Sequence, residues 1–307
     1  MTARVLCIGD VMLDVITKIA VMPDKINYGS DTPSKISTHG GGAAGNVASW
    51  LTRTDARATI VGHVGDDAAG SALMSEFDAL GVHHENLMVD KGSSGVVVVL
   101  VDPTGERTMF PDNGANSGLH IGDLPELDGY NAVYLSGYSP LDPLSRPGVL
   151  AMITKIKEVG LPIYFDPASV GGMMEVSLDE VKSWIRLMDV ILLNEEEAIY
   201  LTGETDSEKA MELLLQECET VVIKRGSQGA IGKTRGSILV SVPAQSTDVV
   251  DTTGAGDVHT GALIAALAAG KNWPDSLAIA NRAAAFCVTK FGGPTGPTLA
   301  ELGLKTL

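Results

Sequence analysis

The sequence is short of positive charge. Its 307 residues include 22 Lys and Arg against 38 Asp and Glu, which gives a formal net charge of −16 at pH 7. Nucleic acids and anionic membrane surfaces attract basic patches, so this balance argues against both as partners. A phosphate-bearing ligand is still allowed, because a nest of backbone N–H groups or a bound metal holds an anion on an acidic protein.

Cysteines, aromatic residues and long apolar runs are also scarce. The cysteines Cys7, Cys218 and Cys287 show no metal-binding spacing, and their odd count suits a reducing compartment. No apolar run approaches the roughly 18 residues that cross a bilayer, and Met1–Asp10 predicts a first strand instead of a signal peptide. We therefore expect a soluble, cytoplasmic protein whose core, with only 5% aromatic residues, is mainly aliphatic.

Short, wholly apolar runs alternate with helical patterns along most of the chain. Runs of this length indicate strands buried on both faces, and their alternation with helices predicts βαβ units around a mostly parallel sheet. The apolar runs are Val5–Ile8, Val133–Leu135, Ile163–Phe165, Val190–Leu193 and Val221–Ile223. The helical patterns are Gly70–Leu80, Pro147–Val159, Leu178–Met188, Glu195–Leu201 and Ser207–Gln216.

Two segments fall outside this alternation. Thr17–His39 and Ser93–Asp112 have β-type patterning and turn residues, and we expect them to pair in a small separate sheet. Elsewhere, Asp10, Asp166, Asn194 and Lys224 lie at the carboxyl ends of apolar runs. Ligands of open α/β sheets bind beyond the carboxyl ends of the strands, so the pattern predicts a ligand site at these polar residues.

The strongest chemical signal is the segment Asp251–Asp257, Asp-Thr-Thr-Gly-Ala-Gly-Asp, followed by an apolar helical stretch from Val258 to Ala269. Small residues leave the first-turn N–H groups open, and a helix N-terminus attracts anions. A carboxylate there can take a proton from a hydroxyl beside the bound anion. The segment thus predicts a phosphoryl-binding nest containing a base. The alternative is a glycine turn with Asp257 as an ordinary cap.

Three weaker segments each allow a structural and a functional interpretation. Gly40–Ala48 contains consecutive glycines that suit a hinge or a close approach to a ligand, and Asn46 suits a helix cap or a substrate contact. Asn194–Glu197 is well suited to helix capping, or to a magnesium–phosphate site in which one or two carboxylates suffice. Lys224–Gly229 suits a hairpin turn or a contact to nucleotide phosphates.

Two familiar nucleotide-binding motifs are excluded. Gly232-Lys233-Thr234 resembles the end of a Walker A loop, but the required first glycine is Ser227, and the following segment predicts a strand instead of a helix. No Gly-x-Gly-x-x-Gly follows the first strand, which argues against a dinucleotide oxidoreductase.

Over essentially the whole chain, the sequence resembles the ribokinase family of carbohydrate kinases, also called the PfkB family. The matching residues are Gly41, Gly42 and Asn46 of the N-terminal signature, Asn194 and Glu197 of the Asn-x-x-Glu motif, and Asp251–Asp257 with Gly261 of the C-terminal signature. The resemblance implies one α/β kinase domain over residues 1–307, with a doubly wound, mostly parallel sheet and helices on both faces. It also implies a small β-sheet lid formed by about residues 12–39 and 93–113.

The resemblance further implies a role for each site residue and the cofactors ATP, Mg²⁺ and K⁺. For catalysis they are Asp257 as the base, with the N–H groups of Gly254, Ala255 and Gly256 as the anion hole. The substrate would contact Asp14, Gly41, Gly42, Asn46, Tyr138 and Asp257. ATP would contact Asn194, Lys224, Gly226, Gly229, Gly256 and Asn281. Mg²⁺ would be held by Glu197 through water, and K⁺ by Asp251 and Thr253 together with Lys290–Thr295.

The expected activity is ATP-dependent phosphotransfer to a hydroxyl group of a small sugar. Family ribokinases carry polar or charged residues where this sequence has Met12, Ala43 and Tyr138. These departures remove polar contacts to a sugar, so a nucleoside kinase is the alternative, and a non-catalytic sugar-binding regulator is a third. Family members often pair through the lid, which implies a homodimer.

Overall fold

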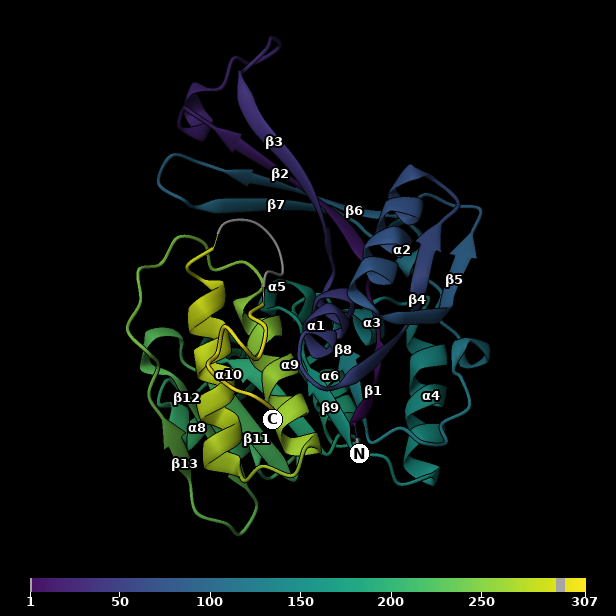
Figure 1. Ribbon diagram of the computed structural model, residues 1–307, viewed down its shortest axis with the longest axis vertical. Helices are drawn as coiled ribbons and strands as arrows, with labels where there is room; N and C mark the ends of the chain where they lie inside the picture. Colours follow the sequence, from purple (N-terminus) through teal and green to yellow (C-terminus); the bar gives the residue numbers. More distant parts are fainter. Residues whose placement is uncertain (1, 291–295) are drawn as a thin grey trace.

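A large sheet forms the body of the molecule, and a smaller sheet lies above it (Figure 1). The computed structural model describes residues 2–290 and 296–307. The large sheet contains β1 (Arg4–Ile8), β4 (Arg57–Gly65), β5 (His83–Asp90), β8 (Ala132–Ser136), β9 (Ile163–Asp166), β10 (Val190–Asn194), β11 (Thr220–Lys224), β12 (Ala230–Thr234) and β13 (Val240–Val242). Within these residues the strand order is β13-β12-β11-β10-β9-β8-β1-β4-β5.

The strand order reverses at the centre of this sheet. From β1 the chain first adds β4 and β5 on one side, and then β8 to β11 on the other, all in parallel. The antiparallel pairs of this sheet, among the residues described, are β11 with β12 and β12 with β13, at one edge. Because open α/β sheets bind ligands where the order reverses, the crevice beyond the carboxyl ends of β1 and β8 is the expected site.

Helices cover both faces of the large sheet. They are α1 (Ala43–Thr52), α2 (Ala68–Leu80), α3 (Tyr138–Leu141), α4 (Arg146–Glu158), α5 (Val170–Met173), α6 (Leu178–Ile185), α7 (Glu195–Thr202), α8 (Ser207–Leu214), α9 (Ala255–Ala268) and α10 (Trp273–Cys287). Short 3₁₀ turns occur at Pro23–Lys25, Gly114–Asn116, Ile121–Asp123 and Gly226–Gln228. Helices α1, α2, α9 and α10 pack on one face, and α4, α6, α7 and α8 pack on the other.

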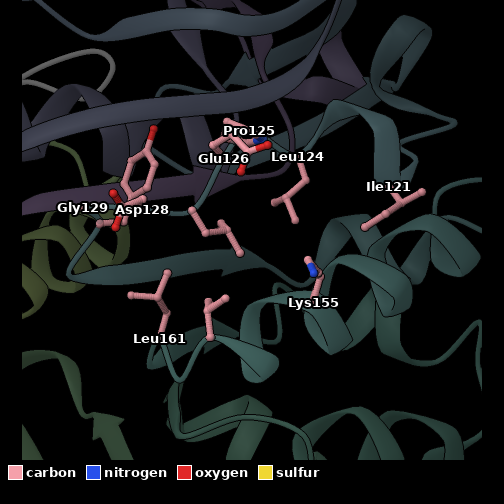
Figure 2. A pocket seen from close by; sticks show the side chains of 11 residues that line it. Ile121, Leu124, Pro125, Glu126, Asp128, Gly129, Lys155 and Leu161 are labelled. Atoms are coloured by element: carbon pink, nitrogen blue, oxygen red, sulfur yellow. The ribbon is translucent and has the colours of Figure 1, made fainter.

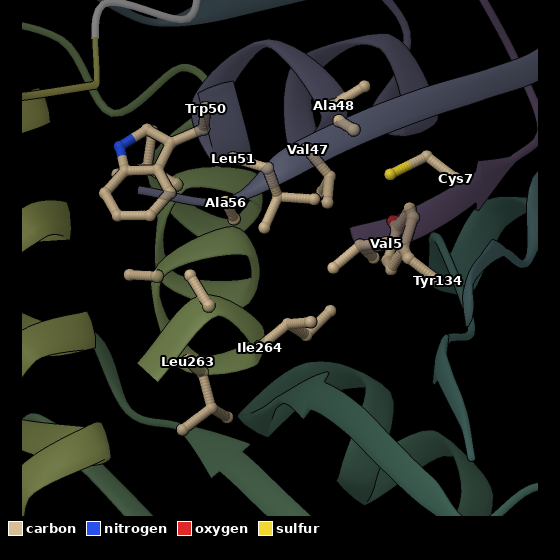
Figure 3. Close-up of a cluster of buried hydrophobic side chains, with 14 of the residues drawn as sticks. Val5, Cys7, Val47, Ala48, Trp50, Leu51, Ala56, Tyr134, Leu263 and Ile264 are labelled. Carbon is tan, nitrogen blue, oxygen red and sulfur yellow. The ribbon is translucent and has the colours of Figure 1, made fainter. Parts of the chain in front are cut away.

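The core shows why the predicted strands are apolar at every position. Val5 and Cys7 of β1 point into one hydrophobic cluster, while Leu6 and Ile8 between them point into the other. Successive side chains of a strand face opposite sides, so a strand covered on both faces needs an unbroken apolar run. Figure 3 shows the first cluster, in which side chains of β1, α1 and α9 meet.

Close packing of α1 against α9 fixes the two helices that carry the strongest motifs. A Cβ at Gly261 of α9 would lie 3.2 Å from Cε3 of Trp50 of α1, and Trp50 is fully buried. A glycine at this crossing therefore lets the two helices approach closely. The contact fixes the N-terminal turn of α9 relative to α1.

The smaller sheet, which we call the lid, contains β2 (Met12–Ile19), β3 (Ser34–Gly41), β6 (Gly95–Val101) and β7 (Arg107–Asp112) in the order β3-β2-β6-β7. Parallel pairing of β2 with β6 joins two segments that are distant in the sequence. On one face Met12, Ile16 and Val99 belong to a small buried cluster. This is the small sheet expected from the two β-patterned segments.

The predicted fold class is confirmed: a mostly parallel sheet lies between two layers of helices, and a four-stranded lid sheet is added to it. The predicted strands and helices agree with the structure to within a few residues at their ends. Within the described ranges, no helix is long and apolar enough to cross a membrane.

Candidate active site

Polar residues gather along the carboxyl edge of the large sheet. Register pairs Ser136 of β8 with Asp166 of β9, and Asn194 of β10 with Lys224 of β11. Asp10 follows β1, and one of its carboxylate oxygens accepts a hydrogen bond of 2.6 Å from Ser136 Oγ. The edge therefore brings together side chains that are up to 214 residues apart in sequence (224 − 10).

Asp257 lies in the first turn of α9 and contacts α1. Nδ2 of Asn46 donates a hydrogen bond of 2.7 Å to its Oδ2. Burial raises the pKa of Asp257 to about 7, the Asn46 bond opposes this rise, Asp166 adds to it and Lys224 opposes it. A carboxylate whose pKa lies near neutral pH is suited to accept a proton from a hydroxyl group.

The buried Oδ1 atom of Asn46 has no hydrogen-bond partner among the described residues. Buried amide oxygens are nearly always satisfied in folded proteins. Since Nδ2 of the same side chain is used by Asp257, Oδ1 is left to accept a hydrogen bond from a ligand. Asn46 can therefore contact both the base and a bound hydroxyl.

The N-terminus of α9 is open to an anion. Gly254 precedes the helix with φ 72°, and no side chain of the described residues caps the helix there. By contrast, Asp67 caps α2, Asp206 caps α8 and Asn272 caps α10. An uncapped helix start exposes backbone N–H groups and the positive end of the helix dipole, which together suit a phosphoryl group.

Lys224 links this helix start to the strand ends. Its Nζ forms an ion pair of 2.8 Å with Asp166, and a Cβ at Gly256 would lie 3.6 Å from the same Nζ. Burial lowers the pKa of Lys224, but the attraction of Asp166 and Glu197 outweighs it, so the net shift is upward. Lys224 is therefore a firmly charged cation beside the helix start. The sequence placed Asp166 at the expected ligand site but did not predict this ion pair.

The Asn-x-x-Glu segment forms a reciprocal cap at the start of α7. Asn194 Oδ1 accepts from the N–H of Glu197, and the Glu197 carboxylate accepts from both the backbone N–H and the side-chain amide of Asn194, at 2.8 Å and 2.7 Å. Burial raises the pKa of Glu197, and repulsion from Asp166 adds to the rise. Two neighbouring carboxyl groups disfavour each other's charge here, which a divalent cation would relieve.

A metal ion at this edge would need oxygen donors from outside the protein as well. In residues 2–290 and 296–307, no group of three or more His, Cys, Asp or Glu side chains is arranged to hold a metal ion. Mg²⁺ keeps several waters and usually takes one or two carboxylates together with substrate phosphates. Glu197 and Asp166 fit that donor set, because both supply carboxylate oxygens.

The lid contributes a carboxylate from the opposite side. Asp14 of β2 is only 7% exposed, and a Cβ at Gly41 of β3 would collide with its carboxylate. Burial raises the pKa of Asp14 to about 7, and repulsion from Asp10 and Glu76 adds to the rise. Gly41 thus makes room for Asp14, while Gly42, with φ 81°, passes close to the backbone of Asp10.

A lid arginine reaches the loop before α9. Nη2 of Arg107 donates a hydrogen bond of 2.6 Å to Thr252 Oγ1. Nη1 donates a hydrogen bond to Thr253 Oγ1 and lies 3.5 Å from Asp251 Oδ1. Asp251 also accepts from the N–H and hydroxyl of Thr253, at 2.8 Å and 2.6 Å. The carboxylate expected to bind potassium is thus already next to a guanidinium group.

The second segment expected to bind potassium is Lys290–Thr295. Lys290 is described, whereas residues 291–295 lie outside the described residues. The backbone N–H groups of Val250 and Asp251 both donate to the carbonyl of Val288, at 2.7 Å and 3.1 Å. The two segments therefore adjoin.

The remaining expected site residues lie farther along the same edge. Asn281 of α10 is buried. Its Oδ1 is hydrogen-bonded to Nε2 of His259, and its Nδ2 donates to the carbonyls of Val242 and Pro243. Its side chain therefore holds the end of β13 against α10. Gly226 and Gly229 flank the 3₁₀ turn between β11 and β12 with φ 53° and 89°, and Tyr138, on α3, is 44% exposed.

A separate hollow lies at the other edge of the sheet. A cavity of about 600 Å³ lies between the segment leading into β8 and the end of α4, where Lys155 and Leu161 line it (Figure 2). Tyr130, which also lines it, precedes β8, so the cavity is at the amino-terminal end of that strand. None of the described residues expected in the site lines this cavity.

The chain is similar to proteins of known family and fold. A model of the pfkB family carbohydrate kinases matches residues 2–299. Aminoimidazole riboside kinase of Salmonella typhimurium is 29% identical over 305 residues, which cover 95% of this chain and 91% of the relative. The crystal structure of the Salmonella enterica enzyme with aminoimidazole riboside and an ATP analogue covers 95% of each chain at 27% identity and a TM-score of 0.78.

Other solved structures share the fold. Adenosine kinase from Sinorhizobium meliloti is 23% identical and has a TM-score of 0.86 over 99% of each chain. Among relatives of this fold, an Escherichia coli structure contains ATP and Mg²⁺, and a Vibrio cholerae fructokinase contains fructose, ADP and a potassium ion.

Proposed function

Because the chain belongs to the PfkB family of carbohydrate kinases, we propose that it transfers the terminal phosphoryl group of ATP to a hydroxyl group of a small sugar. One observation carries the proposal: a carboxylate of near-neutral pKa, Asp257, lies in the first turn of an uncapped helix start. The base and the anion-binding N–H groups of Gly254, Ala255 and Gly256 thus belong to one helix. We also propose that residues 1–307 act as one unit, with the lid covering the sugar.

Asp257 would act as the general base. The acceptor hydroxyl, held by Asp14 and by the unpartnered Oδ1 of Asn46, would give its proton to Asp257 as its oxygen attacks the phosphoryl group. Phosphoryl transfer needs mainly positioning and charge stabilisation, and the helix start supplies both. Gly41 and Gly42 would serve by letting Asp14 and Asp10 approach the acceptor.

The ATP phosphates would lie between the start of α9 and the ends of β10 and β11. Lys224 would approach them as a charged donor, with Asn194, Gly226 and Gly229 along the same edge and Asn281 behind the nucleotide. Glu197 would hold Mg²⁺ through water, and the metal would neutralise charge on the phosphates. A potassium ion beside Asp251 and Thr253 would steady the loop that leads into Gly254.

A nucleoside is the second candidate acceptor. The half-exposed ring of Tyr138 suits the face of a base, and the buried Met12 offers no polar contact to a sugar. The riboside kinase among the relatives acts on an acceptor of this kind.

The lid also offers a surface for a second copy of the chain. Ile36, Val98 and Phe110 lie on its outer face and are 66%, 39% and 56% exposed. Apolar faces of this kind mark protein–protein contacts. We infer a homodimer that pairs these outer faces.

Turnover of ATP against a panel of pentoses, hexoses and nucleosides tests the kinase proposal. ATP consumption that depends on one acceptor class supports it and identifies the class. Tight binding of a sugar without any ATP consumption would instead indicate a regulator, and would contradict the assignment of Asp257 as a base.

A further inference from the structure

Asp10 is a further carboxyl group close to the residues proposed to hold the acceptor. Asp10 is fixed at both oxygens, by the Ser136 hydroxyl at 2.6 Å and by the N–H of Ala43 at 2.7 Å. Its charge reaches both neighbours, because it raises the pKa of Asp14 and of Asp257. Asp10 therefore adds negative charge near both the lid carboxylate and the base, and its carboxylate cannot rotate without losing a hydrogen bond.

Asp14 is prepared for a ligand that donates hydrogen bonds. Its side chain makes no hydrogen bond within the described residues, although it is 93% buried (100 − 7). Glu76 lies behind it, held by the N–H of Gly40 at 2.9 Å, and adds negative charge. A desolvated carboxylate without a partner is costly, so a hydroxyl or ammonium donor would relieve it.

The charged groups that act on Asp14 are other carboxyl groups. The influences on the pKa of Asp14 are burial and repulsion from Asp10 and Glu76, all of which raise it. Lys224 is paired with Asp166 on the ATP side, and Arg107 bonds the loop before α9. Both cations are thus engaged on the phosphoryl side of the site.

We propose that Asp10, Asp14 and Glu76 restrict the enzyme to acceptors without negative charge, namely neutral or positively charged sugars and nucleosides, and exclude sugar phosphates and sugar acids. The inference rests on the kinase function proposed above and specifies its acceptor class. An acceptor anion within about 7 Å of one of these carboxylates would lose about 10- to 100-fold in affinity at an effective dielectric constant of about 20. A neutral polyol does not suffer this repulsion, and its hydroxyl groups can donate hydrogen bonds to the same carboxylates.

Matched pairs of acceptors test the proposal. Ribose is compared with ribose 1-phosphate, fructose with fructose 6-phosphate, and glucose with glucuronic acid, by ATP consumption and by calorimetric binding to Asp257→Asn protein. We expect the neutral member of the best pair to have a kcat/KM at least tenfold above that of its anionic partner, and to bind correspondingly tighter. Equal or better use of an anionic member would overturn the proposal while leaving the kinase function intact. Absence of turnover with every acceptor would overturn the kinase function itself.

Charge-removing variants locate the origin of the preference. Glu76→Gln keeps an oxygen that accepts from the N–H of Gly40 but removes the charge, and Asp10→Asn does the same at the central position. In either variant the neutral-to-anionic ratio of kcat/KM should fall by threefold or more. Glu126→Gln, an exposed position at the opposite edge of the sheet, is the matched control and should leave the ratio unchanged. An unchanged ratio in folded Glu76→Gln and Asp10→Asn proteins would refute the assignment.

Discussion

Replacing Asn46 by Ala should shift the pH dependence of the enzyme toward higher pH. The Asn46 amide donates a hydrogen bond of 2.7 Å to Asp257. This bond lowers the pKa of Asp257, whereas burial raises it, and the resulting pKa is about 7. A hydrogen bond to a charged group contributes about 1.5–3 kcal/mol when it is buried. Asp257 is partly exposed and water can replace the amide, so we expect a smaller shift, of about 0.5–1 pH unit.

The sign of the effect follows from the role of the base. Asp257 must be ionised to accept a proton, so activity falls as pH drops through its pKa. If that pKa rises from about 7 to about 7.5–8, the ionised fraction at pH 7 falls from about one half to about one quarter to one tenth. At pH 7, kcat/KM should therefore fall about twofold to fivefold because less Asp257 is ionised. This loss should disappear at pH 9, where Asp257 is ionised in both proteins.

The assay is the pH profile of kcat/KM between pH 5.5 and 9.5, which reports the free enzyme. Asn46 is also proposed to touch the acceptor, and that loss lowers kcat/KM equally at every pH. Ser49→Ala, at another buried polar position of α1, is the control and should leave the acid limb in place. An Asn46→Ala profile that is lowered but not displaced would show that Asn46 does not tune the base.

Three further changes test other parts of the site. Glu197→Gln should raise the Mg²⁺ concentration needed for half-maximal activity several-fold while the fold is retained; unchanged magnesium dependence would remove Glu197 from the metal site. Asp14→Asn should raise the acceptor KM about 10- to 100-fold and leave ATP binding unchanged. It should also raise the melting temperature at pH 8, because it removes a buried carboxylate charge whose pKa is raised to about 7. A lower melting temperature would contradict this. Potassium should raise turnover above that in a large organic cation, and more so in Arg107→Ala, which removes a competing positive charge beside Asp251. Equal rates in both salts would exclude the cation site.

The local parts of the structure could be predicted from the sequence. An apolar run such as Val190–Leu193 has one stable position, a strand covered on both faces, because either face would otherwise expose hydrocarbon. The reciprocal cap at Asn194 and Glu197 follows from residues three apart at a helix start. The uncapped start of α9 likewise follows from its small residues.

The long-range contacts could not be predicted. Asn46 meets Asp257 across 211 residues, and Lys224 meets Asp166 across 58, because strand order and helix packing bring them together. Neither pair has a local pattern. The sequence placed Asp166 and Asp10 at the expected ligand site but predicted neither of their side-chain contacts. The contact of Arg107 with the loop before α9 depends on how the lid lies over the body, which local pattern does not specify.

The most direct test of the proposed mechanism is the turnover of Asp257→Asn at saturating ATP and acceptor, with both ligands' binding measured separately. Asn keeps the shape and the helix start, so both dissociation constants should stay within a few-fold of the parent. A positioned general base contributes about 10²–10⁴ in rate, and kcat should fall by about that factor. A variant that binds both ligands and turns over within a few-fold of the parent would show that Asp257 is only part of the helix start and not the base.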